Sequence, residues 1–122
     1  MNKQIYGYGT ETMPVPEYKE AVSYDANVQR VTAKIYQRVI IGVRVMLPPA
    51  SVYTLVEQTA EARRQAIAAI THSKDYDWLM EHNWSGHIPM FKYTEDTVND
   101  VLIGTMDFYI DEQDYIVHLL GR

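Results

Sequence analysis

The chain has 122 residues, of which 47% are hydrophobic and 22% charged, and its formal net charge at pH 7 is -5. This length and composition predict a single folded domain and exclude an intrinsically disordered chain. The acidic balance disfavours binding of duplex nucleic acid over the whole surface. The absence of cysteine excludes disulfides, thiolate metal sites and a thiol nucleophile.

Residues 1–26 contain two glycines and two prolines and have no useful periodicity, so we predict an extended N-terminal arm in front of one α+β domain, residues 27–122. The arm is expected to lie on its own domain or on a neighbouring subunit because it is rich in apolar and aromatic residues: Ile5, Tyr6, Tyr8, Met13, Val15, Tyr18 and Tyr24. It lacks the apolar core of a secretory signal, and the chain has no run of about 18 apolar residues that would span a bilayer. We therefore predict a cytoplasmic protein that does not contact membranes.

Over residues 29–47 apolar residues occupy the odd positions from Val31 to Leu47, with Gln37 as the exception, which predicts a strand with one buried face. The even positions include four cations: Arg30, Lys34, Arg38 and Arg44. A strand of this length would span roughly 55–60 Å, so we expect a bend, with Gly42 as a bulge or a sheet corner. Two strands joined by a loose turn near residues 36–38 are the alternative.

Residues 51–71 are predicted to form the main helix, with Ser51 as its N-cap. A helical wheel gives this helix an apolar face made of Val52, Leu55, Val56, Thr59, Ala66, Ile67 and Ile70. Arg63 falls about 20° from the centre of that face. It either forms an ion pair with a carboxylate of the sheet, faces a subunit interface or an anionic ligand, or extends its charge to solvent. Arg64 lies on the polar side, three residues from Glu61.

The second half of the chain predicts shorter elements: a helix over residues 74–83 capped by Ser73, an edge strand over 90–93, and a helical turn or two from Thr94 to Gly104, with a strand over 101–104 as the alternative. Residues 105–120 predict a hairpin whose Asp107 and Asp111 share a face with Arg38 and Arg44. The predicted fold is α+β: an antiparallel sheet with one long bent strand (29–47) and a C-terminal hairpin (105–120), packed by one main helix (51–71) and one or two short helices.

No motif in the sequence supports catalysis, a metal or a cofactor. His82 and His87 lack a compact metal-ligand spacing, and no nucleophile elbow surrounds Ser85. The N-terminal glycines lack the following helix of a phosphate-binding loop. We therefore predict a non-enzymatic protein without cofactor or metal.

Three functions fit the sequence, and the first is a self-associating assembly or interaction protein, because the aromatic arm, the overlong strand and Arg63 all call for a partner. Small proteins of this kind are common in phage virions and mobile elements, and that association suggests a phage protein of the host cytoplasm or the virion. The second is sequestration of a small anionic ligand such as a nucleotide, which would inhibit a signalling or defence pathway. The third is an acidic inhibitor of a basic, nucleic-acid-binding protein.

Candidate ligand or interface residues follow from these functions. Aromatic rings can stack on a nucleotide base, and guanidinium groups can bind its phosphates. The candidates are Trp78, Trp84, His87, Phe91 and Tyr93, together with Arg63, Arg64 and Arg44.

Overall fold

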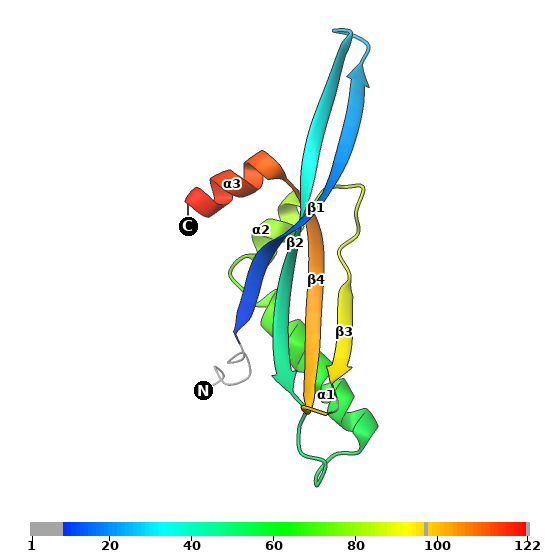
Figure 1. The fold of residues 1–122 in the computed structure, drawn as a ribbon, viewed down its shortest axis with the longest axis vertical. Coiled ribbons are helices and arrows are strands. Elements are labelled where there is room, and N and C mark those ends of the chain that lie inside the picture. The colour runs from blue at the N-terminus through cyan, green and yellow to red at the C-terminus, as the bar shows by residue number, and fades with distance from the viewer. Residues whose placement is uncertain (1–8, 97, 122) are drawn as a thin grey trace.

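The computed structural model describes residues 9–96 and 98–121 and contains one antiparallel sheet of four strands in the order β1-β2-β4-β3 (Figure 1). Three helices complete the α+β fold that the sequence predicts. Of the predicted N-terminal arm, residues 1–8 lie outside the described residues. The elements are β1 (Thr10–Asp25), β2 (Arg30–Met46), α1 (Leu55–Thr71), α2 (Tyr76–His82), β3 (Phe91–Asp96), β4 (Val101–Asp111) and α3 (Glu112–Leu120).

Strand β2 is a single strand of 17 residues, which confirms the long strand read from the alternating pattern. The expected bulge at Gly42 is wrong, because Gly42 pairs in unbroken register with Glu11 of β1 and Thr105 of β4. The irregularity lies instead in β1, where the register shifts between Val15 and Tyr18. The intervening Pro16 cannot donate to a ladder, so a proline on this edge strand accounts for the shift.

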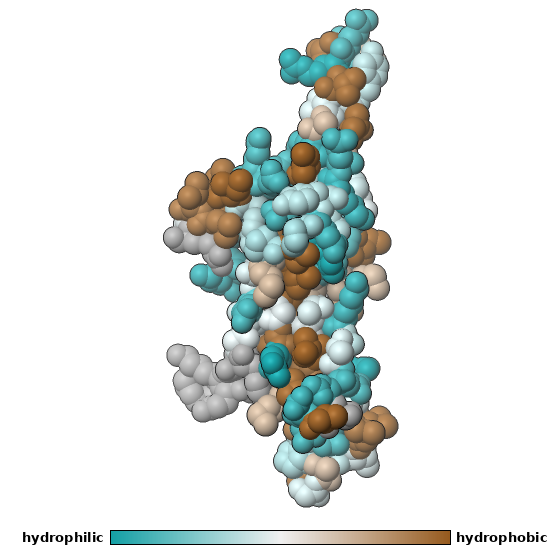
Figure 2. Space-filling model, viewed as in Figure 1, coloured by the Kyte–Doolittle hydropathy of each residue, from teal (hydrophilic) through white to brown (hydrophobic). Residues whose placement is uncertain are grey.

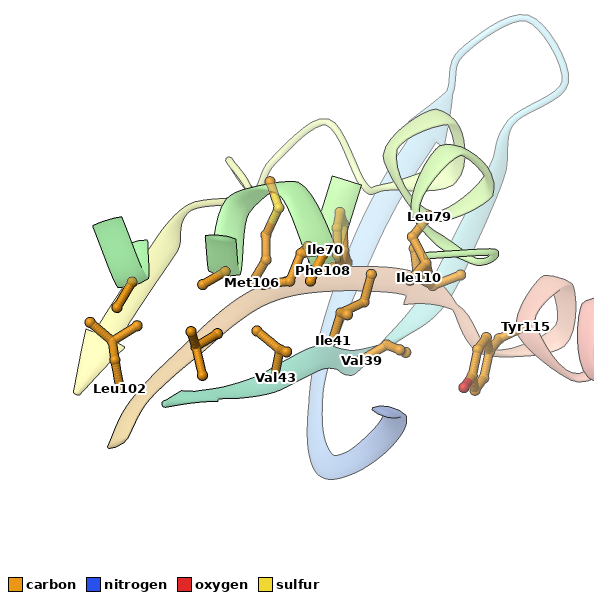
Figure 3. Packing of buried hydrophobic residues seen from close by; sticks show 14 residues of the cluster. Val39, Ile41, Val43, Ile70, Leu79, Leu102, Met106, Phe108, Ile110 and Tyr115 are labelled. Carbon is orange, nitrogen blue, oxygen red and sulfur yellow. The ribbon is translucent and has the colours of Figure 1, made fainter. Parts of the chain in front are cut away.

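The core lies between one face of the sheet and helices α1 and α2 (Figure 3). Apolar side chains of the two central strands meet Ile70 of α1 and Leu79 of α2 there. The strands contribute Val39, Ile41, Val43, Val45, Leu102, Met106, Phe108 and Ile110. The odd positions of β2 are therefore buried from residue 39 onward, as the alternation predicts.

The stripe that helix α1 buries overlaps the face predicted by the helical wheel at Ala66 and Ile70 only. Its buried residues are the small or branched side chains Ala62, Ala66, Ala69 and Ile70, whereas Val52, Leu55 and Val56 are exposed. Alanines allow a close approach to the sheet, since an added Cβ on Gly104 would lie only 2.9 Å from the Cβ of Ala66. Large apolar residues dominate a helical wheel, so the predicted apolar face was displaced from the alanine stripe that contacts the sheet.

The N-cap of α1 is Thr54, so the expectation of Ser51 is wrong. The Glu57 backbone N–H donates to Thr54 Oγ1 (3.2 Å), and the Thr54 backbone N–H donates to Glu57 Oε1 (2.8 Å). This reciprocal capping box satisfies two N–H groups that a helix start leaves without partners. The hydrogen bond from the Thr54 backbone also lowers the pKa of Glu57.

We expect Thr54→Ala to lower the free energy of unfolding by about 1 kcal/mol, because the first turn of α1 loses its side-chain cap. Ser51→Ala is the matched control and should change it by less than about 0.5 kcal/mol, as for surface sites without such a role. Urea unfolding followed by circular dichroism measures both variants. Equal losses for the two would contradict the assignment of the cap.

The predicted C-terminal hairpin is half wrong: residues 105–110 lie within β4, but Glu112–Leu120 form helix α3. The side chain of Asp111 accepts hydrogen bonds from the backbone N–H groups of Gln113 (2.9 Å) and Asp114 (3.2 Å), and this cap starts a helix. A short apolar run such as residues 115–120 does not distinguish a strand from a helix by its period. The cap decides between them.

The predicted helix from Thr94 is also wrong. Thr94 and Asp96 belong to β3 and pair with Ile103 and Val101 of β4, so the alternative of a strand over 101–104 is confirmed. The short helix over residues 74–83 is confirmed as α2, but its N-cap is Asp75 rather than Ser73. The edge strand predicted over residues 90–93 is confirmed as the first half of β3.

Candidate functional site

The most conspicuous feature of the molecule is a two-stranded ribbon, residues 18–35, which projects beyond the body at one end (Figure 1). The last pair between β2 and β4 is Tyr36 with Asp111, so residues 30–35 of β2 pair only with β1. Tyr36 also pairs with Lys19 of β1. At about 3.3 Å per residue, residues 20–25 of β1 therefore reach roughly 20 Å past that point. An isolated two-stranded hairpin is marginally stable in water, so contact with a partner would stabilise this ribbon.

One face of the ribbon is apolar. Side chains alternate along a strand and paired residues share a face, so the odd positions of β2 in the ribbon continue the face that is buried in the body. Its large apolar members are between 46% and 64% exposed: Tyr18, Val22, Tyr24, Val31 and Ile35. Glu20 is the one charged residue on this face of the ribbon. We call this surface the apolar face of the ribbon.

The opposite face of the ribbon is polar and carries most of its charge. It presents Lys19, Ser23, Asp25, Arg30, Thr32 and Lys34. Over residues 18–35 the three cations outnumber the two carboxylates Glu20 and Asp25, so the negative excess of the chain resides entirely outside the ribbon. The ribbon is thus an amphipathic, slightly basic extension of an acidic body.

Helix α3 leaves the body at the same level as the ribbon, because Asp111, which caps α3, pairs with Tyr36 at the base of the ribbon (Figure 1). A cleft of about 340 Å³ separates the two and is lined by residues 32–35 and 111–113. Tyr115 anchors α3 in the core, and His118 Nε2 lies 3.1 Å from Asp75 Oδ1. The remaining apolar side chains of α3 are exposed: Ile116, Val117, Leu119 and Leu120.

A polar network holds the base of the ribbon on the sheet face away from α1 and α2. Arg38 lies between two carboxylates: its Nε donates to Asp107 Oδ2 (3.3 Å) and its Nη1 to Glu17 Oε1 (3.1 Å). His87 Nε2 donates to the Asp107 carbonyl (3.1 Å). The prediction that Asp107 and Asp111 share a face with Arg38 and Arg44 is confirmed by the register of β2 and β4. Asp107 forms an ion pair with Arg38, whereas Asp111 caps α3. Arg38 therefore has a structural role at the base.

Three of the predicted site residues meet on the opposite side of the body, between α1 and β3. The Arg63 guanidinium lies 5.2 Å from the Tyr93 ring centroid, and its Nη2 donates to Glu95 Oε1 (3.3 Å). This is the first of the three alternatives for Arg63, an ion pair with a carboxylate of the sheet. Phe91 stacks beside Tyr93 at 6.3 Å. Burial raises the pKa of Tyr93, and the charge of Arg63 opposes that rise.

The other predicted site residues lie in separate places. Trp78 is stacked between His82 (4.2 Å) and His118 (3.9 Å), and so joins α2 to α3. Trp84 stacks on Tyr36 at 5.1 Å.

The remaining cations are dispersed as well. Arg64 donates to Glu61 in its own helix (3.0 Å). Arg44 lines a shallow apolar trough of about 420 Å³ with Met13 and Ile103. The predicted aromatic and guanidinium groups therefore do not converge on one ligand site.

Sequence reasoning missed the residues that make the ribbon apolar, although a signal was present. Tyr18, Val22 and Tyr24 alternate with Lys19, Ser23 and Asp25, which is the period of a strand. The prolines that precede them shift the register, so the alternation is interrupted when the N-terminal segment is examined as a whole.

Comparison of the chain with protein-family models, curated proteins and solved structures finds no match in any of the three. Over residues 9–96 and 98–121, no helix has the length and apolar character needed to cross a membrane. In the same described part of the chain, no three His, Asp or Glu side chains are grouped closely enough to hold a metal ion.

Proposed function

We propose that this chain is a non-enzymatic protein that associates with further copies of itself through the ribbon. The proposal rests on a difference in burial along one face of β2. The odd residues of that strand are buried from Val39 to Val45 but half exposed at Val31 and Ile35. The same alternation runs through both parts. A face built to be buried and left open by its own chain is typical of a protein interface.

The size of this face supports association. A fully exposed aromatic side chain presents about 150–250 Å², so at the exposed fractions given above the apolar face leaves on the order of 500 Å² open per chain. Two such faces reach about 1,000 Å², the lower limit for a specific interface. Tyrosine, which contributes two of these residues, is also enriched in interfaces.

A second copy is the partner that the charges favour. The ribbon is slightly basic and the rest of the chain acidic, so the ribbon of one copy and the body of another attract each other even though whole chains repel. The polar network of Arg38 fixes the base of the ribbon, which limits the conformational freedom lost on binding.

Light scattering during size-exclusion chromatography of the full chain tests the proposal. We expect the weight-average mass to rise from one chain toward two or more between about 1 and 100 µM, the range in which association of about 7 kcal/mol becomes visible. Sedimentation velocity gives an independent measure. A single-chain mass across the whole range would contradict self-association.

A further inference from the structure

Helix α3 carries an exposed apolar face that could receive the ribbon of a second copy. Residues 116, 117 and 120 fall within an arc of about 100° on a helical wheel, opposite the buried Tyr115. Their exposed fractions are 51%, 67% and 81%. Figure 2 shows hydrophobic side chains gathered on α3. A group of exposed apolar side chains on one helix face is typical of a surface that a partner covers.

We infer that the apolar face of the ribbon of one copy docks on α3 of a second copy, and that a two-fold axis repeats the contact in reverse. This inference rests on the proposed self-association and names the surface that the ribbon binds. The ribbon and α3 start from the same pair, Tyr36 and Asp111, so one two-fold axis can bring each ribbon to the partner's α3.

The area required by a stable dimer favours this arrangement over contact between ribbons alone. The exposed apolar side chains of α3 add on the order of 300–400 Å² per chain, by the same estimate from exposed fractions. Reciprocal contacts would then bury roughly 1,600–1,800 Å² in total, which lies within the usual range of about 1,600 ± 400 Å². Ribbons alone reach only the lower limit.

Charge complementarity points to the same pair of surfaces. Residues 111–120 contain three carboxylates, Asp111, Glu112 and Asp114, and neither lysine nor arginine. The ribbon carries Lys19, Arg30 and Lys34 on its polar face, and these three cations outnumber its two carboxylates, Glu20 and Asp25. A basic ribbon against an acidic helix start steers the docking, whereas two basic ribbons repel each other.

Disulfide trapping tests the contact directly, because the chain has no cysteine of its own. One chain carries Val31→Cys in the ribbon, the other carries Val117→Cys in α3, and the two are mixed under reducing conditions, left to exchange subunits and then oxidised. We expect the mixed dimer on a non-reducing gel in clear excess over either homodimer. Val98→Cys, at a 90% exposed position, replaces Val117→Cys in the control mixture and should give no excess.

The outcomes separate this inference from the proposed function. A dominant Val31→Cys homodimer would mean that ribbon docks on ribbon, and excess mixed dimer with Val98→Cys would mean that another surface receives it; either overturns the inference and leaves self-association intact. A chain that stays monomeric by light scattering overturns both. As a second measurement, Ile116→Ser with Val117→Ser should raise the dimer Kd by about tenfold or more, and an unchanged Kd would contradict docking on α3.

Discussion

Val22→Glu combined with Val31→Glu should convert the associating chain into a monomer without loss of its fold. Both valines lie on the apolar face of the ribbon, in diagonal positions of the β1–β2 ladder, because Val22 pairs with Ala33 and Tyr24 with Val31. Docking would then remove two carboxylates per chain from water without partners, which is strongly unfavourable. We expect Kd to rise at least about 100-fold, or ~2.7 kcal/mol, by light scattering across a concentration series.

The matched control places the same two charges on the polar face. Ala21→Glu with Thr32→Glu has the same diagonal spacing, since Ala21 pairs with Lys34 and Ser23 with Thr32. The spacing of the two new carboxylates is then alike in the two double variants, while in the control Ala21→Glu also lies opposite Lys34, a favourable cross-strand pair. Association should be retained in the control. Equal loss in both, or retention in the Val22→Glu and Val31→Glu variant, would rule out the apolar face as the interface.

The strand pattern predicted where a face must be buried but not what buries it. Alternation over residues 29–47 indicated β2 and its burying side, and the odd residues from Val39 onward do lie under α1 and α2. The same alternation at Val31 and Ile35 leads to an open surface. Period two encodes the direction of a side chain relative to its neighbours, whereas burial depends on which element crosses that face.

Local hydrogen bonds overrode the pattern where the predictions failed. Thr54 with Glu57 and the cap at Asp111 each decide where a helix starts, and both depend on side-chain geometry that hydrophobicity does not report. The left-handed backbone at Asp100, with φ of 53°, belongs to the connection that returns β3 into β4. The helix predicted for residues 94–104 did not include this reversal of the chain.

The scattered site residues illustrate the same limit for function. Arg63 was identified from its place on a helical wheel, and an ion pair with a carboxylate of the sheet was one of three alternatives, which the pair with Glu95 now satisfies. Trp78 and Trp84 lie six residues apart in sequence, yet one stacks against helix α3 and the other against Tyr36 of β2. Which aromatic meets which surface is a tertiary property, and the spacing of the two tryptophans in the sequence gave no indication of it.

Gly104→Ala should be the most damaging single-methyl substitution in the sheet. Gly104 lies in the central strand β4 between Val43 and Tyr93, directly beneath α1. The new Cβ would lie 2.9 Å from the Cβ of Ala66, closer than such atoms pack, so the helix and the strand must separate. We expect a loss of about 1–3 kcal/mol in the free energy of unfolding, as for overpacking elsewhere, measured by urea denaturation.

Gly42→Ala supplies the matched control in the neighbouring strand. Its Cβ would meet the Thr105 Cγ2 at 3.8 Å, which is ordinary contact, so the variant should be neutral or gain up to about 1 kcal/mol through the unfolded chain. Ala66→Gly combined with Gly104→Ala should lose less than the sum of the single losses, because the deleted methyl removes the clash. Strict additivity would contradict the close approach of α1 to β4. Since neither glycine lies in the ribbon or in α3, dimerisation should persist wherever these variants remain folded, which separates the packing of the body from the surface that associates.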